Sequence, residues 1–289
     1  MDDVYFLKEM HEYIDREFEE FGYYKALVWE LFCFFNDICH EENLRYFVAF
    51  GSLIGVIRDA GSIPWDYDMD VVMPIDERDR LIAILKERLP SSMYYVYTDN
   101  LEDYPTSCLR ICKKGYPFTS IHLDVFFAIG CPDNNPLSFV KHVDHIHELR
   151  FNKYANKWFP DNSKSKIYRL LSHIRALRGR FVFSRKLIRD EERCNFKYPL
   201  EKSKYCCIVS DPYLKYYYTE DFKEFKQMEI NGQLINIPTG YDRYLRTIYG
   251  DYMTYLPIKK RFTEFHTMTN IVKERQILMD TSDIFDAYK

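Results

Sequence analysis

The chain reads Phe50-Gly51-Ser52-Leu53-Ile54-Gly55-Val56-Ile57-Arg58 and, four residues later, Ile63-Pro64-Trp65-Asp66-Tyr67-Asp68-Met69-Asp70-Val71. Three carboxylates recur in the second segment at a spacing of two. On an extended chain alternate side chains share a face, so Asp66, Asp68 and Asp70 point one way and Met69 and Val71 point into a core. Like charges this close are unfavourable unless a cation lies between them. The segment is too apolar for a solvated acidic turn. It therefore predicts a row of carboxylates, Asp66, Asp68 and Asp70, that binds a divalent metal ion, and we call this row the acidic ledge.

The ligands of this predicted ion are all oxygen atoms, which indicates Mg²⁺ or Mn²⁺ rather than zinc. A further acid is expected from a neighbouring strand, and Asp124 lies in the apolar run Ile121–Phe127. An unpaired carboxylate there would be costly. Asp124 is therefore a metal ligand, the base that accepts the proton of an acceptor hydroxyl, or a carboxylate held by a buried arginine. The predicted catalytic residues are Asp68, Asp70 and Asp124, and the predicted metal ligands are Asp66, Asp68, Asp70 and Asp124.

Gly51 and Ser52 precede the acidic segment and predict a phosphate site. A glycine at a strand end lets a phosphate approach the backbone. The amides at the start of the following helix, predicted over residues 53–58 with Ser52 as its N-cap, can hold that phosphate.

The remaining pattern predicts an α+β protein with a mixed β-sheet flanked by helices. We expect helices at 24–43, 75–89 and 241–249, the last ending at Gly250, and strands at 46–50, 68–73, 93–98, 107–112 and 120–128. Asn231-Gly232 predicts a two-residue hairpin turn between 225–230 and 234–237. Residues 1–289 form one predicted domain: a core at 1–130, a basic helical insertion at 137–204, and a closing hairpin and helices at 205–289.

The predicted insertion carries 17 Lys or Arg against seven Asp or Glu, although the whole chain has a net charge of −4. Such a basic segment either contacts an anionic membrane surface or lipid-linked acceptor, or packs an apolar stripe on the domain with its cations in water. Nucleic acid is not expected, because no recognised binding motif accompanies the charge. Aromatic residues make up 17% of the chain, which suits either core and interface packing or surfaces for stacking sugars or bases.

The start of the chain lacks the features of a signal peptide, and no run of about 18 apolar residues occurs. The eight cysteines show no paired metal-site spacing, so we expect reduced, mostly buried thiols. A zinc site that includes Cys206 and Cys207 is the weaker alternative. We expect a cytoplasmic protein, or one peripheral at the inner face of the membrane.

The motif resembles the LicD family of phosphotransferases, which includes the fukutin-type proteins. The matching positions are Gly51, Ser52, Leu53, Gly55, Arg58, Gly61, Ile63, Pro64, Trp65, Asp66, Asp68 and Asp70. Further similarity covers Arg110, Lys113, the segment 122–126 and a closing segment with Tyr249-Gly250-Asp251-Tyr252. Three positions depart from the usual pattern: Ser52 for Thr, Asp59 for His and Tyr67 for Asp.

The resemblance implies a nucleotidyltransferase-like fold and transfer of phosphocholine or a phospho-alditol from a CDP-activated donor, such as CDP-choline or CDP-ribitol. The acceptor would be a hydroxyl of a glycan or lipid-linked glycan, with release of CMP, in the synthesis of cell-surface polysaccharides such as teichoic acid or lipopolysaccharide. Arg58 and Arg110 are candidate phosphate clamps, with ordinary ion pairing as the alternative. The expected substrate-binding residues are Gly51, Ser52, Arg58, Trp65, Arg110, Lys113, Lys259, Arg261 and His266.

Two other functions use the same residues. A nucleotidyltransferase would attach a nucleoside monophosphate to a small molecule or protein, so its acceptor would gain a nucleotide and no CMP would be released. A non-catalytic binding protein would keep the fold, but the loss of an acid that marks such a state is not seen, because all four aspartates are present.

Overall fold

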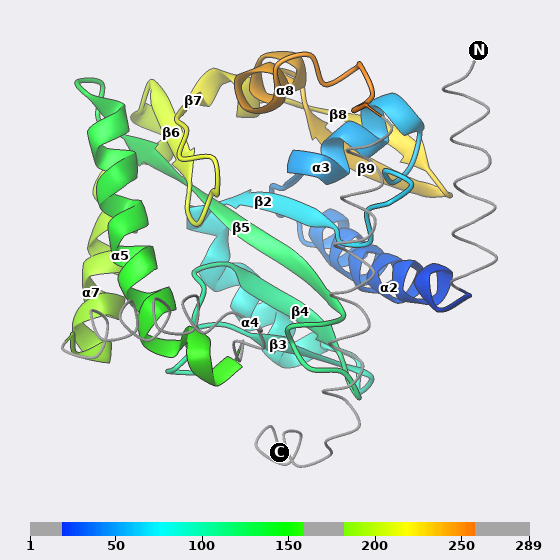
Figure 1. Cartoon of the computed structure of the whole chain (residues 1–289), viewed down its shortest axis with the longest axis horizontal. Coiled ribbons are helices and arrows are strands. Elements are labelled where there is room, and N and C mark those ends of the chain that lie inside the picture. The colour runs from blue at the N-terminus through cyan, green and yellow to red at the C-terminus, as the bar shows by residue number, and fades with distance from the viewer. Residues whose placement is uncertain (1–18, 159–181, 258–289) are drawn as a thin grey trace.

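The computed structural model describes residues 19–158 and 182–257 of the chain (Figure 1). Its strands are β1 (Phe47–Val48), β2 (Asp70–Pro74), β3 (Met93–Val96), β4 (Leu109–Lys113), β5 (His122–Cys131), β6 (Tyr205–Ile208), β7 (Tyr217–Tyr218), β8 (Phe225–Ile230) and β9 (Gln233–Pro238). Its α-helices are α2 (Glu19–Glu41), α3 (Phe50–Ile54), α4 (Arg78–Arg88), α5 (Pro136–Trp158), α7 (Ser184–Asn195) and α8 (Tyr241–Tyr249). Shorter turns are the π-helix η1 (Gly55–Asp59) and the 3₁₀ helices η2 (Ile75–Glu77), η3 (Leu200–Lys202) and η4 (Thr219–Phe222).

A seven-stranded mixed sheet organises the described part of the chain. Its strands follow the order β1-β2-β5-β4-β3, and β6 pairs with the far half of β5 and with β7. Only β2 and β5 are parallel, whereas the other pairs in this sheet are antiparallel. The hairpin β8–β9 forms a separate two-stranded sheet. The predicted α+β class with a mixed sheet is therefore confirmed.

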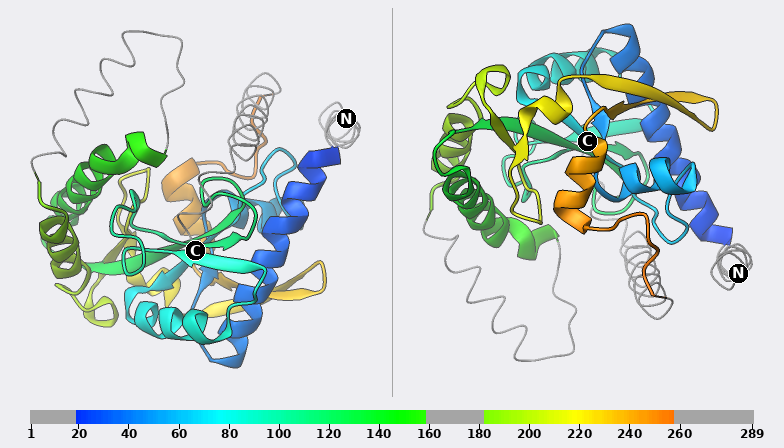
Figure 2. Two further views of the ribbon diagram at one scale, coloured as in Figure 1. Left: turned by 90° about the horizontal axis from the view of Figure 1, so that it is seen from below. Right: turned by 90° about the horizontal axis from the view of Figure 1, so that it is seen from above.

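The long strand β5 is the centre of this arrangement, because one half pairs with β2 and β4 and the other half with β6. Helix α2 contacts β4 and β5, whereas α5 packs on α7 and on β5. Figures 1 and 2 show α2 on one side of the molecule and the α5–α7 pair on the other. The start of β2 therefore lies between elements that come from distant parts of the sequence.

Helix α2 forms because its apolar residues recur at helical spacing and face the sheet. The buried positions of this stripe are Tyr24, Leu27, Val28, Leu31, Phe32, Phe35 and Ile38. Strands β2 and β5 are buried almost throughout, as expected for strands that are covered on both faces. The seven buried cysteines are free thiols, and Cys33 is half-buried. The expectation of reduced, mostly buried cysteines is thus confirmed.

Two local predictions are wrong at the turn that follows β1. Only residues 47–48 of the predicted strand 46–50 pair as a strand, because Phe50 adopts a φ of +47° and begins α3. Ser52 is not an N-cap, since it lies inside α3, whose N-cap residue is Ala49. The predicted helix 53–58 is instead α3 followed by the π-helix η1, a rare geometry that occurs mostly at functional sites.

The hairpin and the closing helix are confirmed. Asn231 and Gly232 have φ values of +49° and +80°, as a tight turn with two left-handed residues requires, and they join β8 to β9. Helix α8 ends before Gly250, which has a φ of +67°.

The basic middle of the chain contains two described helices, α5 and α7. Residues 159–181 of the predicted basic insertion lie outside the described residues. Among the helices that the structure describes, none is long and apolar enough to cross a membrane.

We predict that Gly55→Ala destabilises the fold by about 1–3 kcal/mol, because a Cβ at this position would lie 2.7 Å from the carbonyl oxygen of Gly61 and 2.8 Å from the amide nitrogen of Ile63. Denaturant unfolding of the purified variant measures this loss. Gly61→Ala is the matched control, since its Cβ would meet one backbone oxygen at 4.0 Å. Equal free energies of unfolding for the two variants would contradict the prediction, because η1 would then accommodate a Cβ at position 55 without cost.

Candidate functional site

The acidic segment enters β2 as an extended chain with alternating burial. Tyr67 and Met69 are buried, whereas Asp66, Asp68 and Asp70 are half-buried. The strand itself begins at Asp70, two residues later than predicted, and the carbonyl of Met69 directly before it already accepts from the Asp124 amide of β5 at 3.2 Å. The three carboxylates therefore share one face, as the spacing of two predicts.

The turn from β1 into α3 fixes the backbone of Asp70. The Asp70 amide donates to Oγ of Ser52 at 2.9 Å, and the Asp70 carbonyl accepts from the Ala49 amide at 3.0 Å. Gly51 allows a carboxylate to approach this turn, because a Cβ there would lie 3.0 Å from Oδ2 of Asp66. Gly51 and Ser52 thus position the acidic segment directly.

Asp70, Asp124 and Arg110 lie side by side across three strands. Asp70 pairs in register with Asp124 across β2 and β5, and Arg110 pairs with Asp124 across β4 and β5. Nε and Nη2 of Arg110 donate to the two oxygens of Asp124 at 2.6 and 3.3 Å. Nη1 of Arg110 donates to the Phe118 carbonyl at 3.2 Å. The structure thus contains the pairing of Asp124 with a buried arginine, which the sequence offered as one alternative.

This pairing determines the charge of Asp124. Burial by itself raises the pKa of a carboxyl group, but the Arg110 guanidinium and His122 outweigh it and hold the pKa of Asp124 well below its usual range. Nε2 of His122 lies 3.5 Å from Oδ2 of Asp124. Asp124 is therefore ionised at neutral pH.

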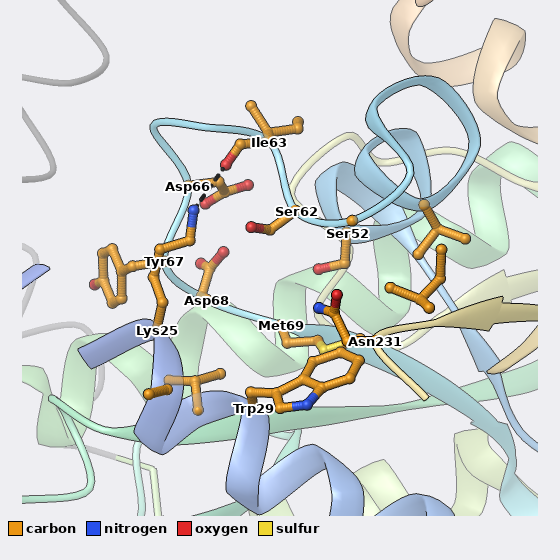
Figure 3. Close-up of a pocket in the computed structure, with 15 residues that line it drawn as sticks. Lys25, Trp29, Ser52, Ser62, Ile63, Asp66, Tyr67, Asp68, Met69 and Asn231 are labelled. Carbon is orange, nitrogen blue, oxygen red and sulfur yellow. Dashed lines mark hydrogen bonds between the residues drawn. The ribbon is translucent and has the colours of Figure 1, made fainter. Parts of the chain in front are cut away.

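A cavity of about 280 Å³ opens beside the acidic segment (Figure 3). Its polar lining includes Lys25 of α2, Ser52 of α3, Ser62, and the carboxylates of Asp66 and Asp68. In Figure 3 these polar ends lie around one space. The remaining lining is largely apolar: Ala26, Val28, Trp29, Val56, Gly61, Ile63, Tyr67, Met69, Ile230 and Asn231.

Lys25 brings a cation to this group of carboxylates. Its Nζ donates to the carbonyls of Ile63 and Pro64, each at 3.3 Å, and Figure 3 shows it next to Asp66. The ammonium lowers the pKa of Asp66, but burial and the neighbouring Asp68 have the larger effect and raise it well above its usual range. Burial and Asp68 likewise raise the pKa of Asp70.

These raised pKa values indicate that the carboxylates are crowded beyond what the nearby cations balance. The oxygen-only donors suit Mg²⁺, which usually takes one or two carboxylates and completes its shell with water and substrate phosphate. In residues 19–158 and 182–257, no three His, Cys, Asp or Glu side chains are placed as a ready metal-binding cluster. The donor atoms are therefore of the kind that Mg²⁺ prefers, but the described side chains alone do not form a complete metal site.

Several polar residues of the cavity were not predicted from the sequence, namely Lys25, Trp29, Ser62 and Asn231. Lys25 and Trp29 are four residues apart on α2, so they share a helix face, and this spacing was the available signal. Asn231 is predicted as a turn residue, but the long-range contact that brings the β8–β9 turn to the cavity leaves no local pattern.

Three other predicted substrate-binding residues lie in structural contacts. Arg58 pairs with Asp59 at 2.9 Å, donates to the Tyr252 carbonyl at 3.0 Å and lies 4.2 Å from the ring centre of Tyr255. Nζ of Lys113 lies 2.6 Å from Oε1 of Glu30. Trp65 is buried beside the acidic segment. Lys259, Arg261 and His266 lie outside the described residues, so the structure does not place them.

We predict that Arg110→Met lowers the free energy of unfolding by about 3–5 kcal/mol, because it leaves the carboxylate of Asp124 buried without its partner. Lys113→Met is the matched control on the same strand. Its partner Glu30 is half exposed, so we expect a loss of about 1 kcal/mol or less. Denaturant unfolding compares the two, and a similar loss in both variants would contradict the importance of the buried pair.

We predict that stability decreases as pH rises through the raised pKa values of Asp66 and Asp70, because the folded state binds protons there that the unfolded chain has released. Millimolar Mg²⁺ should restore much of this stability at neutral pH. Thermal unfolding from acidic to neutral pH, with and without Mg²⁺, measures both effects. Asp66→Asn should reduce the pH slope and the response to Mg²⁺, and an unchanged slope would contradict the assignment.

Comparison with known proteins finds similarity over the segment that forms this site. Residues 43–163 match the family model described as LicD/FKTN/FKRP, nucleotidyltransferase domain. The chain is similar to the lipopolysaccharide cholinephosphotransferase LicD of Haemophilus influenzae, with 28% identity over 241 residues that cover 78% of this chain and 88% of the relative. It is also 29% identical over 118 residues to an uncharacterized protein of Rickettsia prowazekii, which covers 38% of this chain and 41% of that protein. The matched segment contains the turn at Gly51-Ser52, the three acids of the ledge and the Arg110–Asp124 pair, so the similarity to the LicD family covers the residues that form the candidate site.

Proposed function

We propose that this protein is a metal-dependent phosphotransferase that moves a phospho-substituent from a CDP-activated donor to a hydroxyl group of a glycan and releases CMP. The observation that carries the proposal is the placement of the Asp66 and Asp68 carboxylates, the Lys25 ammonium and the Ser52 hydroxyl around one cavity. The similarity to a lipopolysaccharide cholinephosphotransferase supports the class of reaction.

The cavity suits the diphosphate of the donor. Lys25 and the hydroxyls of Ser52 and Ser62 can contact phosphate oxygens, and Trp29 and Asn231 offer a flat ring and an amide to a base. Asp66 and Asp68 line the cavity and would hold Mg²⁺ or Mn²⁺, which would neutralise the diphosphate when bound. Without such a cation, the carboxylates would repel the donor.

In the transfer, the oxygen of the acceptor hydroxyl bonds to the distal phosphorus while the bond from that phosphorus to the CMP oxygen breaks. The hydroxyl proton passes to a carboxylate. Asp70 suits this role because it lies at the start of β2, in register with Asp124 and outside the lining of the cavity that would hold the metal ion. Asp124 is a weaker base, since Arg110 holds its pKa low, and we assign it to the alignment of Asp70 across β2 and β5.

Two predicted phosphate clamps are reassigned in this proposal. Arg110 holds Asp124, and Arg58 connects η1 to the segment after α8. Lys25 supplies the cation at the cavity in their place. Gly51 lets the carboxylate of Asp66 approach the turn. Trp65 is a buried packing residue next to Asp66.

The name of the Haemophilus relative favours phosphocholine over a phospho-alditol and lipopolysaccharide over teichoic acid. We also retain the prediction that the sheet is of the nucleotidyltransferase type. The basic segment 137–204, of which α5 and α7 are described, would contact an anionic or lipid-linked acceptor at the cytoplasmic face of the membrane. A nucleotidyltransferase remains the alternative, because the same carboxylates would serve a nucleoside triphosphate.

We predict that purified protein releases CMP from CDP-choline, CDP-ribitol or CDP-glycerol only when Mg²⁺ or Mn²⁺ is present. Asp68→Asn and Asp70→Asn should each lower this rate by about 100-fold or more, since a carboxylate of the reacting site is lost. Asp76→Asn is the matched control, because Asp76 is exposed beyond the other end of β2.

CMP release that persists in Asp68→Asn would contradict the assignment of the site. If no donor of the panel yields CMP while nucleoside triphosphates give an acceptor whose mass increases by a nucleotide, the alternative function is correct.

A further inference from the structure

The loop between β6 and β7 exposes several large apolar and aromatic side chains together. Tyr213, Leu214, Tyr216 and Tyr218 are each between 36% and 39% exposed, and Leu137 of the adjacent α5 is 40% exposed. Isolated exposed apolar residues are ordinary, but a contiguous group on one loop marks a surface that binds something.

A cavity of about 360 Å³ lies on this loop. Its lining is Leu137, Leu214, Lys215, Tyr216, Tyr217, Tyr218, Asp221 and Thr247. Exposed aromatic rings are therefore combined with the ammonium of Lys215, whereas the buried Asp221 carboxylate is held by Arg243 and the Thr247 hydroxyl donates to the Arg243 carbonyl. This combination suits a sugar, whose C–H faces pack on rings while its hydroxyls form hydrogen bonds with polar groups at the edge.

The loop is held in a fixed conformation. Ser210 and Leu214 have φ values of +68° and +53°, an uncommon conformation for residues other than glycine. The Asp211 carboxylate accepts from the Tyr213 amide at 2.8 Å and from the Tyr217 hydroxyl at 2.5 Å. Oγ of Ser210 lies 3.2 Å from Nδ1 of His147 on α5. Backbone strain of this kind persists where the surroundings enforce it, and it concentrates at ligand-binding sites.

One end of the loop reaches the acidic ledge. The Tyr213 ring packs 6.1 Å from the ring of Phe50, the residue directly before Gly51-Ser52. The Tyr213 hydroxyl donates to the Tyr249 hydroxyl of α8 at 3.0 Å. Burial and the carboxylates of Asp211, Asp70 and Asp66 raise the pKa of Tyr213, as expected for a phenol close to the ledge. The exposed rings thus lead from the proposed reaction centre to the second cavity.

The two cavities are distinct. The lining of the first comes from α2, α3, the acidic segment and the β8–β9 turn, and it shares no residue with that of the second. Phosphoryl transfer needs the attacking oxygen and the leaving oxygen roughly in line on opposite sides of the phosphorus. If the donor occupies the first cavity, the acceptor hydroxyl therefore approaches the phosphorus from the side of the ledge where Tyr213 lies.

We propose that the β6–β7 loop is the acceptor-binding surface, along which an oligosaccharide lies with its reacting hydroxyl near Tyr213 and a more distant sugar in the cavity at Tyr216 and Tyr218. This inference rests on the proposed function. The inference implies that the acceptor is an oligosaccharide bound through several sugar units, so a single monosaccharide is a poor acceptor.

The test uses the full-length protein with two separate measurements. Saturation-transfer NMR reports binding of a core oligosaccharide released from lipopolysaccharide by mild acid, and CMP release without acceptor reports the donor site. We predict that Tyr216→Ala weakens oligosaccharide binding about tenfold and leaves CMP release by hydrolysis unchanged. Tyr213→Phe, which keeps the ring, should bind the oligosaccharide nearly as well as wild type.

Phe183→Ala is the matched control, since this ring is 81% exposed at the start of α7, away from the loop. Equal oligosaccharide binding by wild type and Tyr216→Ala, or no binding by either, would overturn the inference. Binding that depends on Tyr216 without any CMP release from the donors would support the sugar surface and count against the proposed transfer reaction. The two failures are therefore distinguishable.

Discussion

Repulsion among carboxylates at the start of β2 is the constraint on which the rest of the structure depends. Four aspartates lie on or next to this segment, and among the described residues only Asp124 forms salt bridges, with Arg110 and His122. The Ser52 hydroxyl and the Ala49 amide hold the backbone of Asp70 in place. The surrounding fold thus keeps charges together that would separate in a flexible chain, and such preorganisation is what a reaction with a negatively charged donor requires.

The sequence predicts the parts of this site that are local. The alternation of Asp66, Asp68 and Asp70 with buried neighbours follows from strand periodicity, and the Asn231-Gly232 turn follows from its demand for left-handed backbone. Family resemblance supplied the expectation of a donor. These features need only a few consecutive residues, so they can be read without the fold.

The parts that sequence reasoning missed depend on contacts between distant segments. Lys25 on α2 donates to the carbonyls of Ile63 and Pro64, which lie 38 and 39 residues away in the sequence. No local sequence pattern predicts that contact. The sequence offers a buried arginine as one possible partner of Asp124 but does not identify it as Arg110, because the register between β4 and β5 cannot be read from either strand alone. Ser52 was misplaced as a helix cap because the positive φ of Phe50 starts the helix earlier than residue preferences suggest.

The contacts of Arg58 have a consequence for how the protein is made. Its guanidinium holds the Tyr252 carbonyl, 194 residues later, and the Tyr255 hydroxyl donates to the adjacent Asp59. A ribosome builds a chain from its N-terminus at about 5–20 residues per second, so the motif around Gly51 emerges many seconds before the segment that secures it. A nascent chain that stops before residue 252 therefore carries every aspartate of the ledge but lacks the segment that fastens η1, so the motif can be secured only after that segment has been made.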